Sequence, residues 1–524
     1  MRKGLWVFIF CAGLLAFPME HAFGVNLELS LKHAVELGIL NNRDVVIEKY
    51  LHKIALEKVL EARGIFDPVL SSNLEGGRWE VPIAEIFYKN GSYVEEAVRG
   101  GLNLKGKVFT GASYGVDFSM EQYETTSQVV TLSPRYSTRL EFSLTQPLLK
   151  EFGEDITKTK IRIAEKGTQV SKFQVKDRVI RTVSSVEEAY WNLVYAGKVL
   201  DFHKEAARLA KDLLDLTEVK VKAGEMAPIN LVQAKSGLAS MEENVVSAEN
   251  ELKKAEHDLK LLLGMPENEG TLFPLDQPRD IRFIPSLAGI LDSAQKNRPD
   301  LQASKSRLEQ KKIEEKYMND QVLPRLDLIG KYGRRGLSGV PSSVMVTGAG
   351  GKPEPVGDRV QGTVFSGETT GWDSMQELYT GRGFDYWSLG LKLEIPLGNR
   401  EAEGRYRQTK LERMKMETEI KSLDEKIANE VKKGILDIQT TIKMREASGV
   451  TVEYAEQNLQ VEEQRFKAGE STSYDVLKLQ KDVTEAKTRH IKALIEYTKA
   501  WARVRAAEGV SLKEYEIEFN EKMM

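Results

Sequence analysis

The residues Val-Lys-Ala-Gly-Glu at positions 221–225 recur almost unchanged as Phe-Lys-Ala-Gly-Glu at positions 466–470, an offset of 245 residues. Further along, Gly264 and Gly509 keep the same offset. Earlier landmarks keep their order at offsets of 256 or 249: Ser30 with Ser286, Asp44 with Asp300, Pro68 with Pro324, and Pro147 with Pro396. Matching landmarks in the same order indicate an internal twofold repeat whose halves differ by small insertions.

The segments that flank the two similar stretches are expected to be long helices. No proline interrupts the chain between Pro147 and Pro228, and none follows Pro396. A helix over 150–222 would be roughly 110 Å long at about 1.5 Å per residue, far beyond an ordinary globular helix. Three glycines are candidates for bending or dividing it: Gly153, Gly167 and Gly197.

The returning segments carry apolar or small residues at alternating spacings of three and four, over 231–262 and again over 476–507. A period of 3.5 keeps one seam facing a partner helix in a left-handed coiled coil. Each half is therefore predicted to contain a long helical hairpin that turns at the Lys-Ala-Gly-Glu stretch. Gly224 and Gly469 suit this turn because glycine readily adopts the positive φ that ends a helix.

Each half opens with an amphipathic segment that is predicted to be a helix, over 30–63 and 286–319. Ser30 and Ser286 are expected N-caps, because a hydroxyl oxygen can accept a free backbone N–H of the first turn. A proline follows each segment and should begin extended chain.

After these prolines, apolar and polar residues alternate with a period of two over 113–120, 139–144 and 387–395. This alternation indicates strands with one apolar and one polar face. Such strands suit a sheet on a soluble core or a membrane barrel that is apolar outside and polar inside. The long helices and the N-terminal segment favour the barrel. The Gly- and Ser-rich segment 336–383 is expected to be a surface loop.

The first 24 residues are predicted to be a secretory signal. Arg2 and Lys3 precede an apolar run over 5–17, and the small residues Ala22 and Gly24 suit cleavage after Gly24. An N-terminal membrane anchor is the alternative, but a bilayer-spanning helix needs about 20 apolar residues, more than this run provides.

Composition excludes several classes of protein. The 75 Lys and Arg residues nearly balance 78 Asp and Glu residues, and this argues against a nucleic-acid partner held by a basic surface. The single cysteine, Cys11, excludes a disulfide framework and a cysteine-based metal site. Six histidines show no metal-ligand spacing, and no nucleophile or phosphate-loop motif is found. We therefore expect no enzyme activity and no cofactor.

Taken together, these features resemble the TolC-like outer membrane efflux proteins. The resemblance also rests on four short segments: Gln-Pro-Leu-Leu at 146–149, Ala-Tyr-Trp-Asn-Leu at 189–193, Asn-Arg-Pro-Asp-Leu at 297–301 and Leu-Pro-Arg-Leu at 323–326. It implies an α+β membrane protein that forms a homotrimer. Each chain would give four strands to one 12-stranded outer-membrane β-barrel, which a long periplasmic α-helical barrel continues. An open sheet edge is not tolerated in lipid, so chains with few strands must share a barrel.

On this basis the chain is predicted to comprise a signal peptide (1–24), a first repeat (25–265), an equatorial linker (266–285) and a second repeat (286–524). The segment 69–109 is longer than a minimal hairpin needs. It would add strands or form a long external loop, so the strand count stays open.

The resemblance implies an exit duct in the outer membrane, with its helical part in the periplasm, that serves a tripartite efflux pump or a type I secretion system. The implied partners are a periplasmic adaptor protein, an inner-membrane transporter and outer membrane lipid. The hairpin tips would dock the adaptor, although ordinary turn chemistry also explains them: Lys222, Ala223, Gly224, Glu225, Lys467, Ala468, Gly469 and Glu470. The rival hypothesis is a soluble periplasmic coiled-coil scaffold without a channel, which leaves the alternating strands unexplained.

The resemblance further implies a pore constriction just past the tips, at Asn230, Asp475 and Lys478. In a trimer, Asp475 would form a ring of three carboxylates that attracts cations. The family pattern has another aspartate where this chain has Lys478, and the lysine would weaken the ring. Alternatively, Asp475 serves only as a helix N-cap.

Overall fold

The structure is a computed structural model of the 524-residue chain. It describes residues 26–83, 91–127, 129–268, 270–278, 283–347, 352–355, 370–380 and 384–519. The predicted signal peptide lies outside the described residues. The chain divides into two compact units, and both draw on both predicted repeats. The first comprises the residues up to Tyr50, Gln174–Asp300 and those from Asp424 on, and the second comprises Leu51–Phe173 and Leu301–Leu423.

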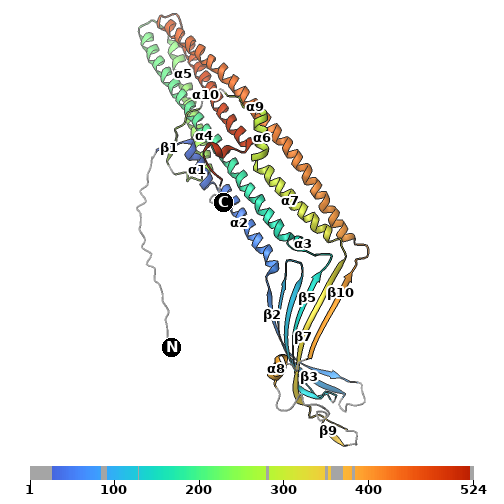
Figure 1. The fold of residues 1–524 in the computed structure, drawn as a ribbon. Coiled ribbons are helices and arrows are strands. Elements are labelled where there is room, and N and C mark those ends of the chain that lie inside the picture. Colours follow the sequence, from blue (N-terminus) through green and yellow to red (C-terminus); the bar gives the residue numbers. More distant parts are fainter. Residues whose placement is uncertain are drawn as a thin grey trace. The chain divides into compact units, whose positions relative to one another are not determined.

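The second unit contains one antiparallel sheet of six strands in the order β10-β7-β5-β4-β3-β2 (Figure 1). The strands are β2 (Val69–Pro82), β3 (Ser92–Lys107), β4 (Ser113–Thr125), β5 (Leu132–Pro147), β7 (Arg325–Pro341) and β10 (Phe384–Glu394). The expectation of four strands per chain is therefore wrong, because the segment 69–109 forms two strands. Its glycines, among them Gly100 and Gly101, interrupt the apolar alternation that would have revealed β3.

At the level of Trp387, the sheet has one apolar and one polar face across all six strands. The pairing register aligns one row of apolar or aromatic side chains: Trp387, Tyr332, Phe142, Val116, Leu104 and Leu70. The adjacent row belongs to the other face and is mostly polar: Tyr386, Gly333, Glu141, Asp117, Asn103 and Ser71. Hydrogen bonds cross strands on this polar face, for example from Tyr386 Oη to Glu141 Oε2 at 2.5 Å.

The segment 336–383 was expected to be a surface loop, but parts of it form strands and a helix. Strand β7 runs on to Pro341, β8 (Met345–Thr347) pairs with β9 (Pro353–Pro355), and α8 (Gly371–Thr380) packs on the sheet. The hydroxyl groups of Ser374 and Thr138 lie 2.6 Å apart. A Cβ at Gly336 would lie 1.8 Å from the Ser374 carbonyl oxygen, so only glycine lets α8 approach so closely.

Four long helices have residues in both units: α2 (Arg43–Arg63), α4 (Thr159–Lys222), α7 (Pro299–Asp320) and α9 (Arg400–Lys467). Within the second unit, Arg413 Nε lies 2.6 Å from Glu315 Oε2 and joins α9 to α7. His52 Nδ1 lies 2.8 Å from Ser171 Oγ and joins α2 to α4. The helix predicted over 150–222 starts later, because Gly153 has φ +92° and the one-turn helix α3 (Glu154–Thr157) comes first.

The first unit contains α1 (Leu31–Asn41), α5 (Pro228–Leu263), α6 (Leu287–Asn297), α10 (Ser473–Glu508) and α11 (Ser511–Glu514). The predicted cap at Ser30 is confirmed, since its Oγ accepts the N–H of His33 at 3.3 Å. Ser286 precedes α6, but its side chain makes no capping bond. The predicted linker also contains an unforeseen strand, β6 (Thr271–Pro274), which pairs in parallel with β1 (Asn26–Leu29).

Each segment predicted to be one opening helix consists of two helices. An equivalent hydrogen bond from a side chain to a backbone carbonyl lies at each break. Asn42 separates α1 from α2 and donates from Nδ2 to the carbonyl of Leu262 at 3.0 Å. Arg298 separates α6 from α7 and donates from Nη1 to the carbonyl of Ala507 at 3.2 Å. These pairs keep the offsets of 256 and 245 residues. Two different side chains thus tie the equivalent helix corner to the end of the returning helix.

Candidate functional site

The two hairpin tips, predicted as docking turns, end their helices in the same way. Gly224 and Gly469 have φ values of +78° and +84°, as expected for left-handed cap residues. The next N–H reaches back to the helix, from Glu225 to Lys220 O and from Glu470 to Arg465 O, each at 2.9 Å. This six-to-one bond is the Schellman arrangement, which satisfies carbonyl groups that the helix end leaves free.

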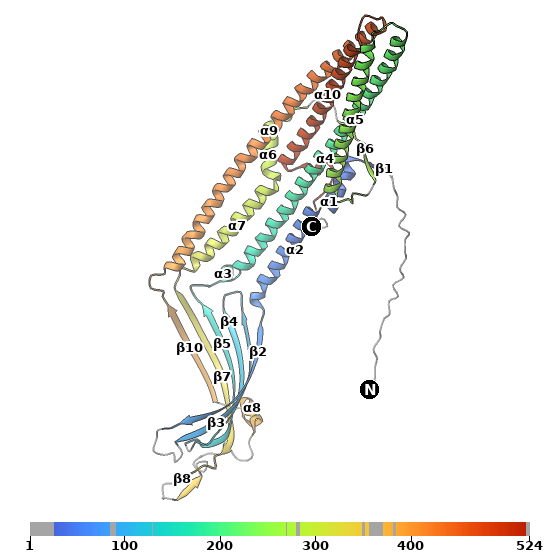
Figure 2. The ribbon, with the colours of Figure 1, turned by 180° about the vertical axis from the view of Figure 1, so that it is seen from behind.

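Both tips lie together within the first unit (Figure 2). Lys220 on the first tip donates from Nζ to the carbonyls of Phe466 and Lys467 on the second, at 2.9 and 3.2 Å. Its ammonium also lies 5.1 Å from the centre of the Phe466 ring, which is only 2% exposed. A cation is favoured at a helix C-terminus, where carbonyl groups point outward. Lys220 therefore joins the two hairpins, a role that the sequence pattern did not predict.

All eight predicted docking residues are exposed on these adjacent turns. Beneath them lies a small apolar cluster from both hairpins: Ala206, Ala210, Leu213, Met241, Phe466, Val476 and Leu477. Large apolar side chains close to the tips are also exposed, including Ile229, Val232 and Tyr474. The tips thus combine a fixed backbone with an exposed surface that is partly apolar and partly charged.

Of the three predicted constriction residues, Asp475 and Lys478 are exposed and Asn230 is half-buried. Thr472 is the N-cap of α10, so the interpretation of Asp475 as the cap residue is corrected. Thr472 Oγ1 accepts the N–H of Asp475 at 3.3 Å and donates to its carboxylate at 2.6 Å. Asn230 O accepts from Ser473 Oγ at 3.1 Å, and this bond brings the starts of α5 and α10 together.

Arg298, from the Asn-Arg-Pro-Asp segment, is the centre of a charged joint. Its guanidinium bonds both carboxylate oxygens of Asp300, at 3.0 and 2.8 Å, and Glu430 at 2.6 Å. The side chain is 13% exposed. Burial alone would lower the pKa of Arg298, but the hydrogen bonds and charges of Asp300 and Glu430 outweigh burial and raise that pKa. This joint connects the α6–α7 corner to α9 and to the end of α10.

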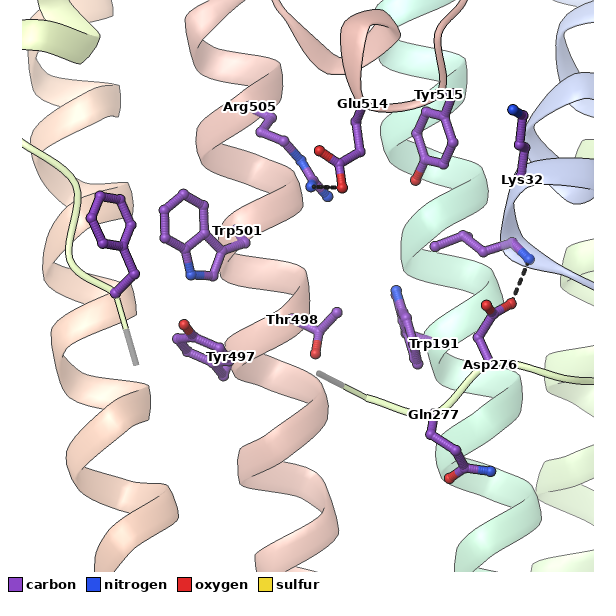
Figure 3. Close-up of a pocket in the computed structure, with 12 residues that line it drawn as sticks. Lys32, Trp191, Asp276, Gln277, Tyr497, Thr498, Trp501, Arg505, Glu514 and Tyr515 are labelled. Atoms are coloured by element: carbon purple, nitrogen blue, oxygen red, sulfur yellow. Dashed lines mark hydrogen bonds and ion pairs between the residues drawn. The ribbon is translucent and has the colours of Figure 1, made fainter. Parts of the chain in front are cut away.

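The first unit also holds a cavity of about 440 Å³, whose lining includes Trp191, Tyr497 and Trp501 (Figure 3). Two of the lining residues contact Glu187, which is 1% exposed: Arg505 lies 3.2 Å from it, and the Tyr515 hydroxyl donates a hydrogen bond to it. Burial raises the pKa of Glu187, although Arg505 and the Tyr515 hydrogen bond oppose this. This network secures the segment after α10, and no local sequence pattern predicts it.

Among the described residues, no group of three or more His, Cys, Asp or Glu side chains could hold a metal ion. Within the same ranges, every helix is too short or too polar to span a membrane.

Comparison with known proteins places these observations in a wider context. The model of the outer membrane efflux protein family matches residues 115–265 and 290–510. A search of curated proteins found no match. Similar solved structures include the outer-membrane channel OprN, with a TM-score of 0.65, 15% identity and coverage of 91% of this chain and 89% of that chain.

Two further channel structures are similar to this chain. The CmeC outer membrane channel of Campylobacter jejuni has a TM-score of 0.64 and 15% identity, covering 94% of this chain and 90% of that one. The open state of the Neisseria gonorrhoeae MtrE outer membrane channel has a TM-score of 0.62 and 14% identity, covering 92% and 89%.

Proposed function

The chain belongs to the outer membrane efflux protein family, and from this we propose that it is the exit duct of a tripartite efflux pump or a type I secretion system. It is a protein of the outer membrane with a periplasmic helical part. In the proposed role it conducts substrates passively, and an inner-membrane transporter supplies the energy. One observation carries the proposal: the same chain holds a sheet with an apolar row across all six strands and two long helical hairpins joined at their tips.

The proposed assembly is a homotrimer that meets a periplasmic adaptor protein at the hairpin tips. Two features support the tips as the docking site. Their backbone is held by left-handed glycines and by Lys220, so the surface is ordered before a partner binds. The tips combine exposed apolar side chains with exposed lysines and glutamates, which suits a partner with an apolar patch and charged groups of both signs.

The test is the oligomeric mass of the protein purified in detergent from outer membranes, with the detergent contribution subtracted. Three chains per particle are expected, together with extraction that requires detergent. A particle of one chain, or release by salt alone, would overturn the duct and favour the soluble coiled-coil scaffold.

A further inference from the structure

We propose that the hairpin β3–β4 is an inserted part of the barrel wall, so that three chains close a barrel of 18 strands. This rests on the proposed trimeric duct and concerns how its membrane part is built. Each chain gives six strands, and the exposed edges β2 and β10 pair with the opposite edges of neighbouring copies.

The repeat identifies β3 and β4 as the insertion. Strands β2 and β7 begin directly after Pro68 and Pro324, which are 256 residues apart. Strand β5 ends at Pro147, and β10 ends just before Pro396, its equivalent 249 residues later. Thus β2 corresponds to β7, and β5 corresponds to β10. Between β7 and β10 the described residues form α8 and the small β8–β9 pair, and neither adds a strand to the sheet.

The side chains of the inserted hairpin match those of the wall. On one face β3 carries Leu102 and Leu104, beside Phe118 and Val116 of β4, in the same rows as Leu140 and Phe142 of β5. On the other face every large group is polar or charged at these levels. Asn103 donates to Asp117, and Arg99 Nε lies 2.6 Å from Glu121 Oε1. Alternation of this kind is what a membrane strand requires, apolar toward lipid and polar toward a water-filled interior.

The two sheet edges are suited to each other. β2 leads away from α2 and β10 leads into α9, so neighbouring copies would present these edges antiparallel. Leu70 and Leu74 of β2 lie on the same apolar face as Leu389 and Leu391 of β10, and all four are exposed. With 14 and 11 residues, both strands are long enough to cross a bilayer. An unpaired edge in lipid leaves backbone groups without partners, so these edges must be closed.

Disulfide mapping of the protein in outer membranes tests the proposal. Ser71→Cys with Asn103→Cys places two cysteines at directly paired positions of β2 and β3, within disulfide reach. Ser71→Cys with Ser143→Cys separates them by two intervening strands, roughly 14 Å at about 4.8 Å per strand, which is too far. For the joint between chains, Ser71→Cys is combined with Ser388→Cys, Gly390→Cys or Lys392→Cys, to cover alternative registers. The single cysteine variants are controls.

The expected results are an intrachain link for Ser71 with Asn103, no link for Ser71 with Ser143, and interchain products up to three chains for at least one β2–β10 pair. A Ser71–Ser143 link would place β2 beside β5 and overturn the proposal, leaving 12 strands. Absence of every β2–β10 link would also overturn it. Three chains by mass with a Ser71–Ser143 link refutes only the insertion, whereas one chain by mass refutes the duct itself.

Discussion

Single side chains hold the helical ends of this protein together across long sequence distances. Lys220 reaches the carbonyls of Phe466 and Lys467, and Arg298 reaches Asp300, Glu430 and the end of α10. Both use charge-assisted hydrogen bonds, which are stronger than neutral ones. The two side chains differ in burial: Arg298 is mostly buried, whereas Lys220 is only partly buried at the hairpin tips.

Replacing Arg298 tests the charged joint. Breaking a buried pair leaves uncompensated charge, so Arg298→Ala should lower stability by about 3 kcal/mol. Arg298→Lys should recover only part of this, because lysine lacks the fork that binds both Asp300 oxygens. Thermal unfolding followed by circular dichroism measures the effect. Arg503→Ala is the control, since its ion pair with Glu188 is exposed and should matter little. Equal effects of the Arg298 and Arg503 variants would contradict this prediction.

Replacing Lys220 tests the link between the tips. Lys220→Met keeps the apolar stem but removes the two hydrogen bonds to the second tip. Loss of about 1–1.5 kcal/mol should speed amide exchange at 466–470 roughly 5- to 12-fold. Hydrogen–deuterium exchange with mass spectrometry reads this directly. Lys222→Met is the matched control, because the ion pair of Lys222 with Glu218, at 2.8 Å, lies within its own helix. An unchanged exchange rate in Lys220→Met would show that Lys220 is not needed to keep the two tips together.

His52 makes stability depend on pH. Burial, with a contribution from Lys172, lowers the pKa of His52 below its ordinary value of 6.5. The neutral form is therefore favoured in the folded state, so this contribution is full above pH 6.5 and is lost as the pH falls below it. Between pH 7.5 and pH 5, the melting temperature should fall less in His52→Gln than in the native protein. His33→Gln, at an exposed position, should behave like the native protein. Identical decreases in melting temperature in the native protein and both variants would show that His52 does not cause this pH dependence.

At the scale of elements, the sequence left two roles open for Asp475, helix capping and cation binding. The contacts at the start of α10 separate these roles. Thr472 caps the helix, and the Asp475 carboxylate accepts from its hydroxyl. A cap contributes about 1 kcal/mol to the helix whatever its charge, whereas a cation site needs the carboxylate charge. Substitutions at the two positions can therefore distinguish capping from cation binding.

If the proposed constriction is correct, Asp475→Asn should weaken divalent-cation block of purified channels severalfold, because it removes the charge from the ring. Thr472→Ala should lower helix stability and leave the block unchanged. Single-channel recordings with increasing concentrations of a divalent cation provide the measurement. Block that survives Asp475→Asn, or that disappears equally in Thr472→Ala, would exclude a specific role of the Asp475 charge in cation binding.

At the scale of the whole molecule, features with strong local signals were predictable and features made by distant contacts were not. The 3,4 spacing over 231–262 and 476–507 corresponds to α5 and α10, and the positive φ of Gly224 and Gly469 is confirmed. The sequence left the number of strands open, because glycines dilute the alternation in β3. The partners of Lys220, and the Glu430 and Ala507 partners of Arg298, lie more than 100 residues away along the chain, so no local pattern predicts these contacts.

The helix α8 bears on the depth at which the protein sits in the membrane. It lies against Thr138 and Gly336, which share the apolar face of the sheet, and it exposes Trp372 and Tyr379 by 68% and 73%. Tryptophan and tyrosine favour the headgroup layer, where the polar end of the ring contacts water and the apolar part contacts the acyl chains. If the proposed barrel is correct, this short helix would therefore lie at the level of the lipid headgroups on the lipid-facing surface. In that position, the exposed Trp372 and Tyr379 would oppose movement of the barrel along the membrane normal in either direction.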